Sequence, residues 1–494
     1  AAAKAREVLG VLPDSVQLQV SGSIIKNVKS VIVPNTGHLK GMEAAVAAGI
    51  IAGSAEKELE VISEVSEEKK SAIRDYLQTV PITIEHTEQG HVFDIVVTER
   101  CGQDYARVRI ADYHTNICRI EKNGTVLYEV PLLDETVQED ARADRSLLNM
   151  QDIWDFAETA DLRDVADLLE RQIRYNNAIA EEGLLGDYGA NIGRVLLTTY
   201  GNDVSNRAKA KAAAGSDARM NGCELPVIIN SGSGNQGITC SVPLIEYAKE
   251  LHSGKEKLYR ALIISNLVAI HEKTGIGTLS AYCGAVSAGA GAGAGIVYLC
   301  GDGYQAAIHT VVNALAIVSG IVCDGAKASC AAKIASSVDA ALLGYNMYKC
   351  NQEFKGGDGI VMKDIETTIK SGGGAIMAMG RASGEGRVQN AILNALDSPL
   401  LYGSDISNAQ RILFNIYTSS KHPIFVREMR EIDAFFDELN PDIKVIWGLS
   451  DDDSLDEDAK VTILATGLNN ELADEIQDNP ITTTKDEDDY QRII

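Results

Sequence analysis

A long stretch in the middle of the chain carries almost no charge, and this feature limits the folds that are open to it. Between Lys273 and Asp302 no residue is formally charged, and between Asp302 and Asp324 only His309 can titrate. The stretch is rich in small and hydroxyl residues, whereas a membrane-spanning helix requires a predominantly apolar run. We therefore expect buried helices at the centre of a domain; a membrane hairpin is the alternative.

The composition is that of a large globular protein with an acidic surface. The chain has 494 residues, 45% of them hydrophobic, which allows roughly two to four domains. Its formal net charge is −25, so phosphate backbones and anionic membranes are repelled, and we expect no nucleic-acid or membrane partner. Nine scattered cysteines without a signal peptide indicate reduced thiols in the cytoplasm. The Ala-rich start reads as the middle of a helix, so we interpret the chain as a fragment.

Three kinds of pattern follow one another along the chain. Residues 1–145 mix alternating strand patterns with helices and predict an α+β domain with antiparallel strands. Residues 146–370 have apolar residues at helical spacing and predict an all-α domain. Residues 371–468 predict a small α+β domain, and the acidic residues 469–494 predict a disordered tail. The strands expected in the first domain are 16–20, 30–34, 82–86, 92–98, 107–111, 118–122 and 126–130.

Three cysteines, Cys283, Cys323 and Cys330, each stand beside small residues. Thiolates are the usual ligands of iron–sulfur clusters, and small neighbours let a bulky cluster approach the backbone. Three ligands would hold three irons of a [4Fe-4S] cluster and leave the fourth open to substrate as a Lewis acid. Buried cysteines that serve as small hydrophobic residues are the alternative. Zinc is less suited, because no C-x-x-C pair nucleates a compact site.

A Gly/Ser loop at 230–239 follows the strand-like residues 226–229 and opens a helix. Such a loop offers backbone N–H groups and hydroxyls to a carboxylate or phosphate. A plain turn is the alternative. The candidate ligand-binding side chains in this loop are Ser231, Ser233, Asn235 and Gln236.

A second polar loop, with Asn35, Thr36 and His38, follows the strand-like residues 31–34. Polar donors at the end of a strand suit an anion or an amino acid, and a surface loop is the alternative. The Gly–Ala run at 289–295 superficially resembles a nucleotide-binding loop. No strand precedes it, so we expect a helix face packed against another helix.

At these motifs the chain resembles the L-cysteine desulfidase family, relatives of the iron–sulfur-dependent L-serine dehydratases. The resemblance covers residues 1 to about 370. It implies a [4Fe-4S] cluster held by Cys283, Cys323 and Cys330. The family also carries a Gly-Cys-Thr-Glu-Pro motif ahead of the first helix, and this sequence does not contain it. The matching stretches are 35–41, 230–239, 270–275, 280–284 and 323–327.

The resemblance implies a lyase that works without pyridoxal phosphate. L-Cysteine would lose sulfide to give aminoacrylate, which hydrolyses to pyruvate and ammonia; an L-serine dehydratase-like activity is the alternative. The two polar loops would hold the substrate carboxylate and ammonium. His271 and Lys327 are candidates, by position, for the group that takes the Cα proton. Either of the histidines on apolar helices, His271 and His309, also fits a histidine of the core.

Residues 371–468 resemble a different family, the C-terminal domain of the division GTPase FtsZ. The resemblance implies contacts with division proteins through 371–468, and an interaction protein is the alternative to an enzyme; homo-oligomer formation stays open. No Gly-Gly-Gly-Thr-Gly-Thr-Gly loop occurs, so we expect no GTP hydrolysis. We interpret the chain as an accidental fusion joined near 364–370. The matching stretches are 375–377, 384–387, 398–401, 413–416 and 461–467.

Overall fold

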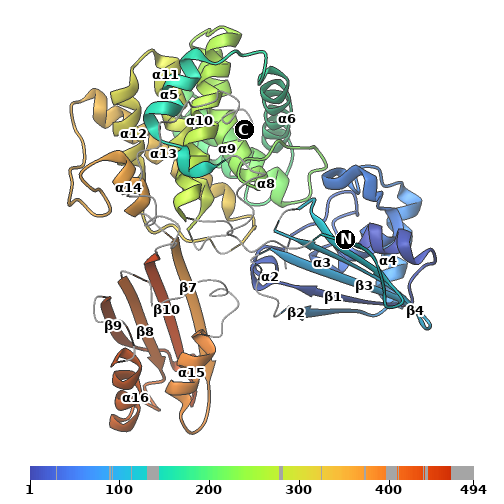
Figure 1. Cartoon of the computed structure of the whole chain (residues 1–494). Coiled ribbons are helices and arrows are strands. Elements are labelled where there is room, and N and C mark those ends of the chain that lie inside the picture. The colour runs from blue at the N-terminus through green and yellow to red at the C-terminus, as the bar shows by residue number, and fades with distance from the viewer. Residues whose placement is uncertain are drawn as a thin grey trace.

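The computed structural model shows an N-terminal lobe, a central helical lobe and a C-terminal lobe (Figure 1). No helix in the described part of the chain is long and apolar enough to cross a membrane. The predicted tail at 469–494 lies outside the described residues. The structure describes residues 1–28, 31–87, 91, 93–112, 114–130, 144–276, 282–323, 325–371, 374–396, 409, 411–437, 439 and 443–468.

The N-terminal lobe is built on a six-stranded sheet with the order β2-β1-β3-β4-β5-β6. Its strands are β1 (Ser15–Val20), β2 (Ile82–His86), β3 (Asp94–Cys101), β4 (Asp104–Ala111), β5 (Ile117–Lys122) and β6 (Thr125–Glu129). Its α-helices are α1 (Ala2–Leu9), α2 (Gly22–Val28), α3 (Gly41–Ala52) and α4 (Glu67–Thr79). The inward side of β1 alternates as its sequence predicts, with Val16, Leu18 and Val20 buried.

Two features of this lobe differ from the sequence-based prediction. The prediction of antiparallel strands is wrong for β1 and β2, which pair in parallel. Parallel neighbours require a long crossover, and the segment with α2, α3 and α4 supplies it. The predicted strand at 30–34 is also wrong for its described part, which forms only an isolated bridge between Ile32 and Lys40. The chain turns back there, because Asn35 and His38 adopt left-handed backbone angles.

The central lobe is helical, and its described residues contain isolated bridges but no named strand. The strand-like residues 226–229 accordingly lie outside any sheet. The uncharged stretch forms α11 and α12, which lie in the main hydrophobic cluster, as the sequence predicted. The helices are α5 (Met150–Thr159), α6 (Ala166–Leu185), α7 (Ile192–Tyr200), α8 (Val204–Met220), α9 (Gly234–Glu250), α10 (Lys255–Ile276), α11 (Gly284–Cys300), α12 (Tyr304–Ile317), α13 (Cys330–Lys349) and α14 (Ile365–Ser371).

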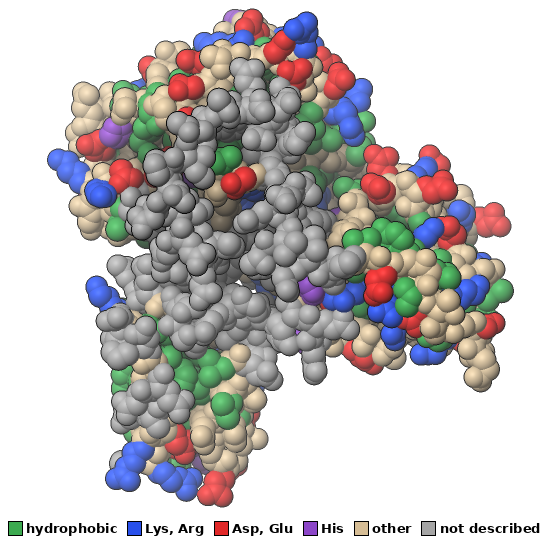
Figure 2. Space-filling model, in the orientation of Figure 1, with side chains coloured by type: hydrophobic (Ala, Val, Ile, Leu, Met, Phe, Trp, Pro, Cys, Tyr) green, Lys and Arg blue, Asp and Glu red, His purple; other side chains and the backbone are tan. Residues whose placement is uncertain are grey.

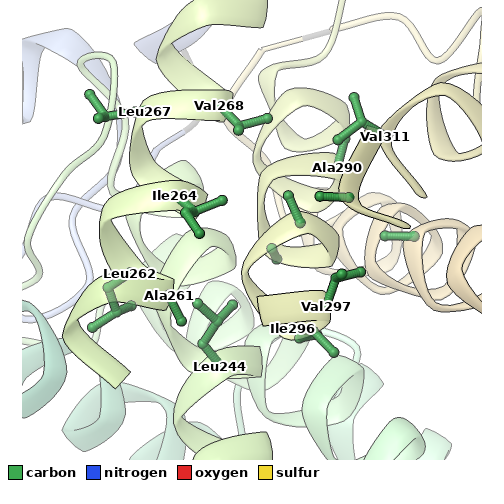
Figure 3. Packing of buried hydrophobic residues seen from close by; sticks show 14 of the residues in the cluster. Leu244, Ala261, Leu262, Ile264, Leu267, Val268, Ala290, Ile296, Val297 and Val311 are labelled. Carbon is green, nitrogen blue, oxygen red and sulfur yellow. The ribbon is translucent and has the colours of Figure 1, made fainter. Parts of the chain in front are cut away.

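The Gly–Ala run confirms the predicted close helix packing. A side chain at Gly291 would meet the Ser265 carbonyl oxygen of α10, and one at Gly289 would meet Ser337 of α13. Neighbouring helices therefore approach the backbone of α11 directly. Figure 3 shows the apolar side chains that fill the remaining space between α10, α11 and α12, including Ile264, Leu267, Val268, Ala290, Val297 and Val311.

The C-terminal lobe has its own sheet and its own core. The sheet order is β7-β10-β8-β9, and only β8 and β9 are parallel. Phe414 is fully buried in the core cluster, whereas Met379, Leu413 and Ile446 are exposed. Figure 2 shows apolar side chains gathered over this lobe. Its elements are β7 (Gly374–Ala382), α15 (Arg387–Leu396), β8 (Arg411–Thr418), α16 (Val426–Asp437), β9 (Lys444–Asp451) and β10 (Ala459–Leu468).

The packing of α11 predicts the effect of one added methyl group. Gly291→Ala should lower the free energy of unfolding by about 1–3 kcal/mol, because its Cβ would lie 2.5 Å from the Ser265 carbonyl oxygen. The higher helix propensity of alanine acts in the opposite direction. Gly303→Ala is the control, since no atom lies within 4 Å of a Cβ there. Urea denaturation followed by circular dichroism measures the free energy of unfolding of both variants. Equal values for the two variants would contradict the close approach of α10 to Gly291.

Candidate active site

The three predicted cluster cysteines lie at the ends of α11 and α13. Cys283 is the residue before α11, Cys330 is the first residue of α13, and Cys323 lies in the connection that precedes α13. The Cys283 amide donates a hydrogen bond to the Ile321 carbonyl at 3.1 Å, which holds the two connections together. Cys283 is buried, whereas Cys323 and Cys330 are half-buried.

The three thiols are close enough to influence one another's charge. Burial raises the pKa of the Cys283 thiol, and the negative charges of Cys323 and Cys330 raise it further. Within the described ranges, no three His, Cys, Asp or Glu side chains form a group that could hold a single metal ion. The cysteines of a cubane bind different irons, so a cluster site is wider than the ligand shell of one ion. Their role as cluster ligands stays a prediction.

Positively charged side chains surround the thiols. Lys273, on α10, is buried, and burial lowers the pKa of its ammonium to about 8, against the opposing effect of the Cys323 and Cys283 thiols. No hydrogen bond or ion pair joins Lys273 to another described residue. Lys333 donates to the Val322 carbonyl at 3.1 Å and lowers the pKa of Cys283. Such cations stabilise thiolates over neutral thiols.

A half-buried arginine lies between the cysteines and the Gly/Ser loop. Arg219 is the last residue but one of α8, and burial lowers the pKa of its guanidinium, partly offset by the Cys330 thiol. Its Nη1 donates to Asn235 Oδ1 at 3.3 Å. A side chain at Gly234 would collide with Arg219 Nε, so the loop backbone lies directly against the guanidinium. Among the described residues, Asn235 accepts one hydrogen bond from Arg219. A guanidinium has five N–H groups, so most of those of Arg219 are available to an anion.

The loop itself presents the start of α9 to this arginine. Ser233 caps α9 by accepting from the Gln236 amide at 3.5 Å, and the Ser231 hydroxyl donates to Asn230 Oδ1 at 3.0 Å. The side chain of Gln236 lies against Gly284, where a Cβ would be 2.5 Å from its Nε2. Gln236 Oε1 is buried and has no hydrogen-bond partner among the described residues. The structure thus brings Asn235 and Gln236 beside the cysteines.

The second predicted loop uses most of its polar atoms internally. Asn35 Nδ2 donates to the Ile62 carbonyl at 2.9 Å, and Thr36 Oγ1 donates to the Val33 carbonyl at 2.7 Å. Thr36 is fully buried. His38 instead extends toward the central lobe, where its Nδ1 lies 3.4 Å from the position that a Cβ on Gly222 would take.

The N-terminal lobe meets the central lobe at the edge of this site. The turn at Gly325, between Cys323 and Cys330, packs on the carbonyl oxygen of Lys26 in α2. The ring of His114 lies beside Gly232 of the Gly/Ser loop, with Cε1 3.6 Å from the Cβ position. In Figure 1, α2 lies at the edge of the N-terminal lobe that faces the central helices. Both lobes therefore contribute to one site.

The two candidate proton acceptors lie in different surroundings. His271 is buried on α10, and its Nε2 lies 2.8 Å from Oε2 of Glu366 on α14. Oε1 of Glu366 accepts a hydrogen bond from the Met150 amide at 2.8 Å, so this contact joins α10, α14 and α5. Lys327 is exposed in the turn before α13, and its amide donates to Cys330 Sγ at 3.5 Å. Their catalytic roles stay predictions.

A buried carboxyl group lies next to Lys273 in sequence. Glu272 is 4% exposed, and no described residue satisfies its two carboxylate oxygens with hydrogen bonds of normal geometry. Burial raises the pKa of Glu272 well above its ordinary value, and the nearby Ser287 hydroxyl offsets only part of this effect. Burial therefore favours the protonated form of Glu272 in the folded protein.

Five site residues were missed by sequence reasoning: Lys26, His114, Arg219, Lys273 and Lys333. Lys273 lies within the quoted 270–275 motif, but lysine is usually a surface residue and gives no signal of burial. Arg219 carried a weak signal, as a cation at the end of an Ala-rich helix just ahead of the loop. His114 lies in a turn between β4 and β5, and only the contact between lobes connects it to the site.

Comparisons with known proteins match two separate parts of the chain. Residues 56–385 match the model of the serine dehydratase alpha chain family, and residues 373–469 match the model of the FtsZ family C-terminal domain. A UPF0597 protein of Desulfitobacterium hafniense is 58% identical over 80% of this chain and 92% of its own. A UPF0597 protein of Lachnoclostridium phytofermentans is 53% identical over 75% of this chain and 88% of its own.

A solved structure also aligns with part of the chain. The FtsZ dimer from M. jannaschii is 19% identical over 46% of this chain and 68% of its own. Its TM-score is 0.20, which is too low for the superposition to bear on the fold.

The buried Glu272 predicts a pH dependence of stability. Because its folded pKa is raised, stability from the protonated carboxyl is fully present below about pH 4.3 and is lost as the pH rises toward the folded value. In the parent this loss in the free energy of unfolding amounts to about 1.4 kcal/mol for each unit by which the folded pKa of Glu272 exceeds its ordinary value. Glu272→Gln should remove the loss, because glutamine does not titrate. Urea denaturation at pH 4.5 and pH 8 measures the gain of the variant over the parent.

The exposed Glu68→Gln is the matched control, because its carboxyl lies in solvent on α4. The stability difference between Glu68→Gln and the parent should change less from pH 4.5 to pH 8 than the difference for Glu272→Gln, because the Glu68 side chain is not removed from water on folding. A Glu272→Gln variant whose difference from the parent does not change between pH 4.5 and pH 8 would contradict a protonated Glu272.

Proposed function

The chain belongs to the serine dehydratase alpha chain family, and on that basis we propose that it is a β-eliminating lyase that releases sulfide and ammonia from L-cysteine. The observation that carries the proposal is the convergence of Cys283, Cys323 and Cys330 beside a buried cation and an anion-binding loop. L-Serine is the second candidate substrate, because the matching family model is that of a serine dehydratase.

The residues present fit a [4Fe-4S] cluster held by the three cysteines. A cluster with thiolate ligands carries negative charge, and Lys273 and Lys333 lie near enough to act on the Cys283 thiol and its neighbours. The side chain of Gln236 packs directly on the backbone of Gly284, next to Cys283, because glycine leaves room for it there. When bound, the cluster would supply an iron without a cysteine ligand, which is a Lewis acid for the leaving group.

Arg219 is the group of this chain that binds the substrate carboxylate. A guanidinium offers two parallel N–H donors that match the geometry of a carboxylate, and burial strengthens such a bond. The start of α9, next to Asn235, adds backbone N–H groups and the positive end of a helix dipole. These groups place the amino acid so that its side chain extends toward the cysteines.

Lys273 provides positive charge where negative charge develops. Sulfide leaves as an anion, and a fixed cation in a site that excludes water stabilises that charge without reorganisation. Lys273 is buried on α10 beside Cys283 and Cys323, at the side of the site that faces the leaving group. The buried amide of Gln236 is available to the substrate ammonium through its unpartnered Oε1.

The activity is tested by sulfide and pyruvate release after anaerobic reconstitution with iron and sulfide. The assay uses L-cysteine and L-serine, with this chain and with the same chain preceded by the Gly-Cys-Thr-Glu-Pro motif. Cys283→Ser should remove the cluster absorbance and reduce turnover by more than the roughly 10–100-fold typical of an outer-shell change. Cys350→Ser, at an exposed cysteine, should change neither. No sulfide or pyruvate from either parent chain would refute the proposal.

Arg219→Gln should raise the KM for L-cysteine roughly 10–100-fold, because a charged hydrogen bond to the carboxylate is lost. The cluster absorbance should stay that of the parent, since Arg219 is not a ligand. Arg194→Gln removes a guanidinium that is paired with Asp187 at the surface, and its KM should equal that of the parent. An unchanged KM in Arg219→Gln would assign the carboxylate to another group.

A further inference from the structure

The proposed elimination needs a group that takes the Cα proton. Histidine is the side chain that most often does this, so we compare the surroundings of the histidines in this chain. The sequence contains eight histidines. In three of them a ring nitrogen lies 2.7–3.1 Å from a carboxylate oxygen: His91, His271 and His309. His86 and His422 also have partners, and His252 lies in the turn between α9 and α10. His38 and His114 each approach a glycine of the central lobe, Gly222 and Gly232 respectively.

His114 lies directly over the Gly/Ser loop. Its Cε1 is 3.6 Å from the Cβ position of Gly232, and no other atom lies within 4 Å of that position. Gly232 and Ser231 both have positive φ, so the loop turns sharply beneath the ring. This is the loop whose next turn carries Asn235, the partner of Arg219. The imidazole therefore lies against the same loop that Arg219 contacts through Asn235.

The ring is held in place without using its nitrogen atoms. Phe93 packs against His114 with 4.7 Å between ring centroids and an interplanar angle of 50°. No described residue forms a hydrogen bond or ion pair with the ring nitrogens of His114. His114 is exposed to solvent as a residue, yet the groups packed around it withdraw enough water to lower the pKa of the imidazole. A positioned, neutral imidazole with a free lone pair is the usual form of a general base.

We propose that His114 is the catalytic base of this site, supplied by the N-terminal lobe to a substrate bound on the central lobe. This inference rests on the proposed lyase function. The imidazole lone pair takes the Cα proton of L-cysteine, and the C–H electron pair becomes the Cα–Cβ double bond. The Cβ–S bond breaks and sulfur leaves with its electron pair as hydrosulfide. The product is aminoacrylate, no atom is oxidised or reduced, and the proton passes from His114 to solvent.

The test compares His114→Asn with the parent on L-cysteine and on L-cysteine deuterated at Cα. Removing a general base costs roughly 10²–10⁴-fold, so kcat should fall by that factor while KM changes little. The deuterium isotope effect on kcat should increase, because proton removal becomes rate-limiting. The acidic limb of the pH profile, which reports protonation of the base, should disappear in the variant.

Two further variants separate catalysis from structure. Phe93→Leu keeps the imidazole but removes its ring partner, so kcat should fall less than in His114→Asn and the acidic limb should persist. His252→Asn is the matched control, because His252 lies in an exposed turn with positive φ that asparagine tolerates. Its kcat and isotope effect should equal those of the parent.

A second measurement does not depend on turnover. Diethyl pyrocarbonate modifies exposed neutral histidines, and mass spectrometry measures each site separately. S-Methyl-L-cysteine should slow modification of His114 and leave His252 unaffected. Parent activity with full kcat in His114→Asn would overturn this inference while leaving the lyase function intact. Loss of kcat in His38→Asn together with full activity in His114→Asn would assign the role to His38. An inactive parent chain would instead refute the proposed function.

Discussion

The glycines of α11 allow neighbouring helices to pack closely against its backbone, and this packing determines the arrangement of the central lobe. Because Gly289, Gly291 and Gly293 carry no Cβ, α10, α12 and α13 approach the backbone of α11. Interiors are packed as densely as organic crystals, so a helix approached from several sides fixes its neighbours. Cys283 immediately precedes α11, and Cys330 begins one of those neighbours. The spacing of the cysteines therefore follows from the packing of α11.

The sequence predicted those parts of the fold in which local pattern and tertiary structure agree. The uncharged stretch predicted buried helices, because neither charge nor a long apolar run was present, and α11 and α12 lie in the core. Alternation predicted β1, in which Val16, Leu18 and Val20 are buried. The parallel pairing of β1 with β2 could not be predicted, because it depends on which edge a distant strand joins.

The candidate site could be predicted only where its residue types are chemically distinctive. Cysteines and a Gly/Ser loop are visible in a sequence, whereas the roles of Arg219 and Lys273 depend on burial, which composition does not report. A buried cation is costly unless negative charge approaches it, and Lys273 is buried close enough to the Cys283 and Cys323 thiols for them to raise the pKa of its ammonium. The position of Cys283 and Cys330 thus depends on the packing of the helices that they begin or precede.

Two families meet in one chain without sharing a core. Ile365 and Ile369 of α14 belong to the central hydrophobic cluster, and Glu366 joins α14 to His271 and to the start of α5. Beyond this helix, apolar residues pack around Phe414 in a separate cluster, and Arg387 forms a buried ion pair with Glu428 at 2.8 Å. The two lobes are nevertheless in contact, because β7 approaches α10, the helix that carries His271 and Lys273. Substitutions deep in the C-terminal core, which leave that contact unchanged, should therefore contribute to stability nearly additively with substitutions in the central cluster.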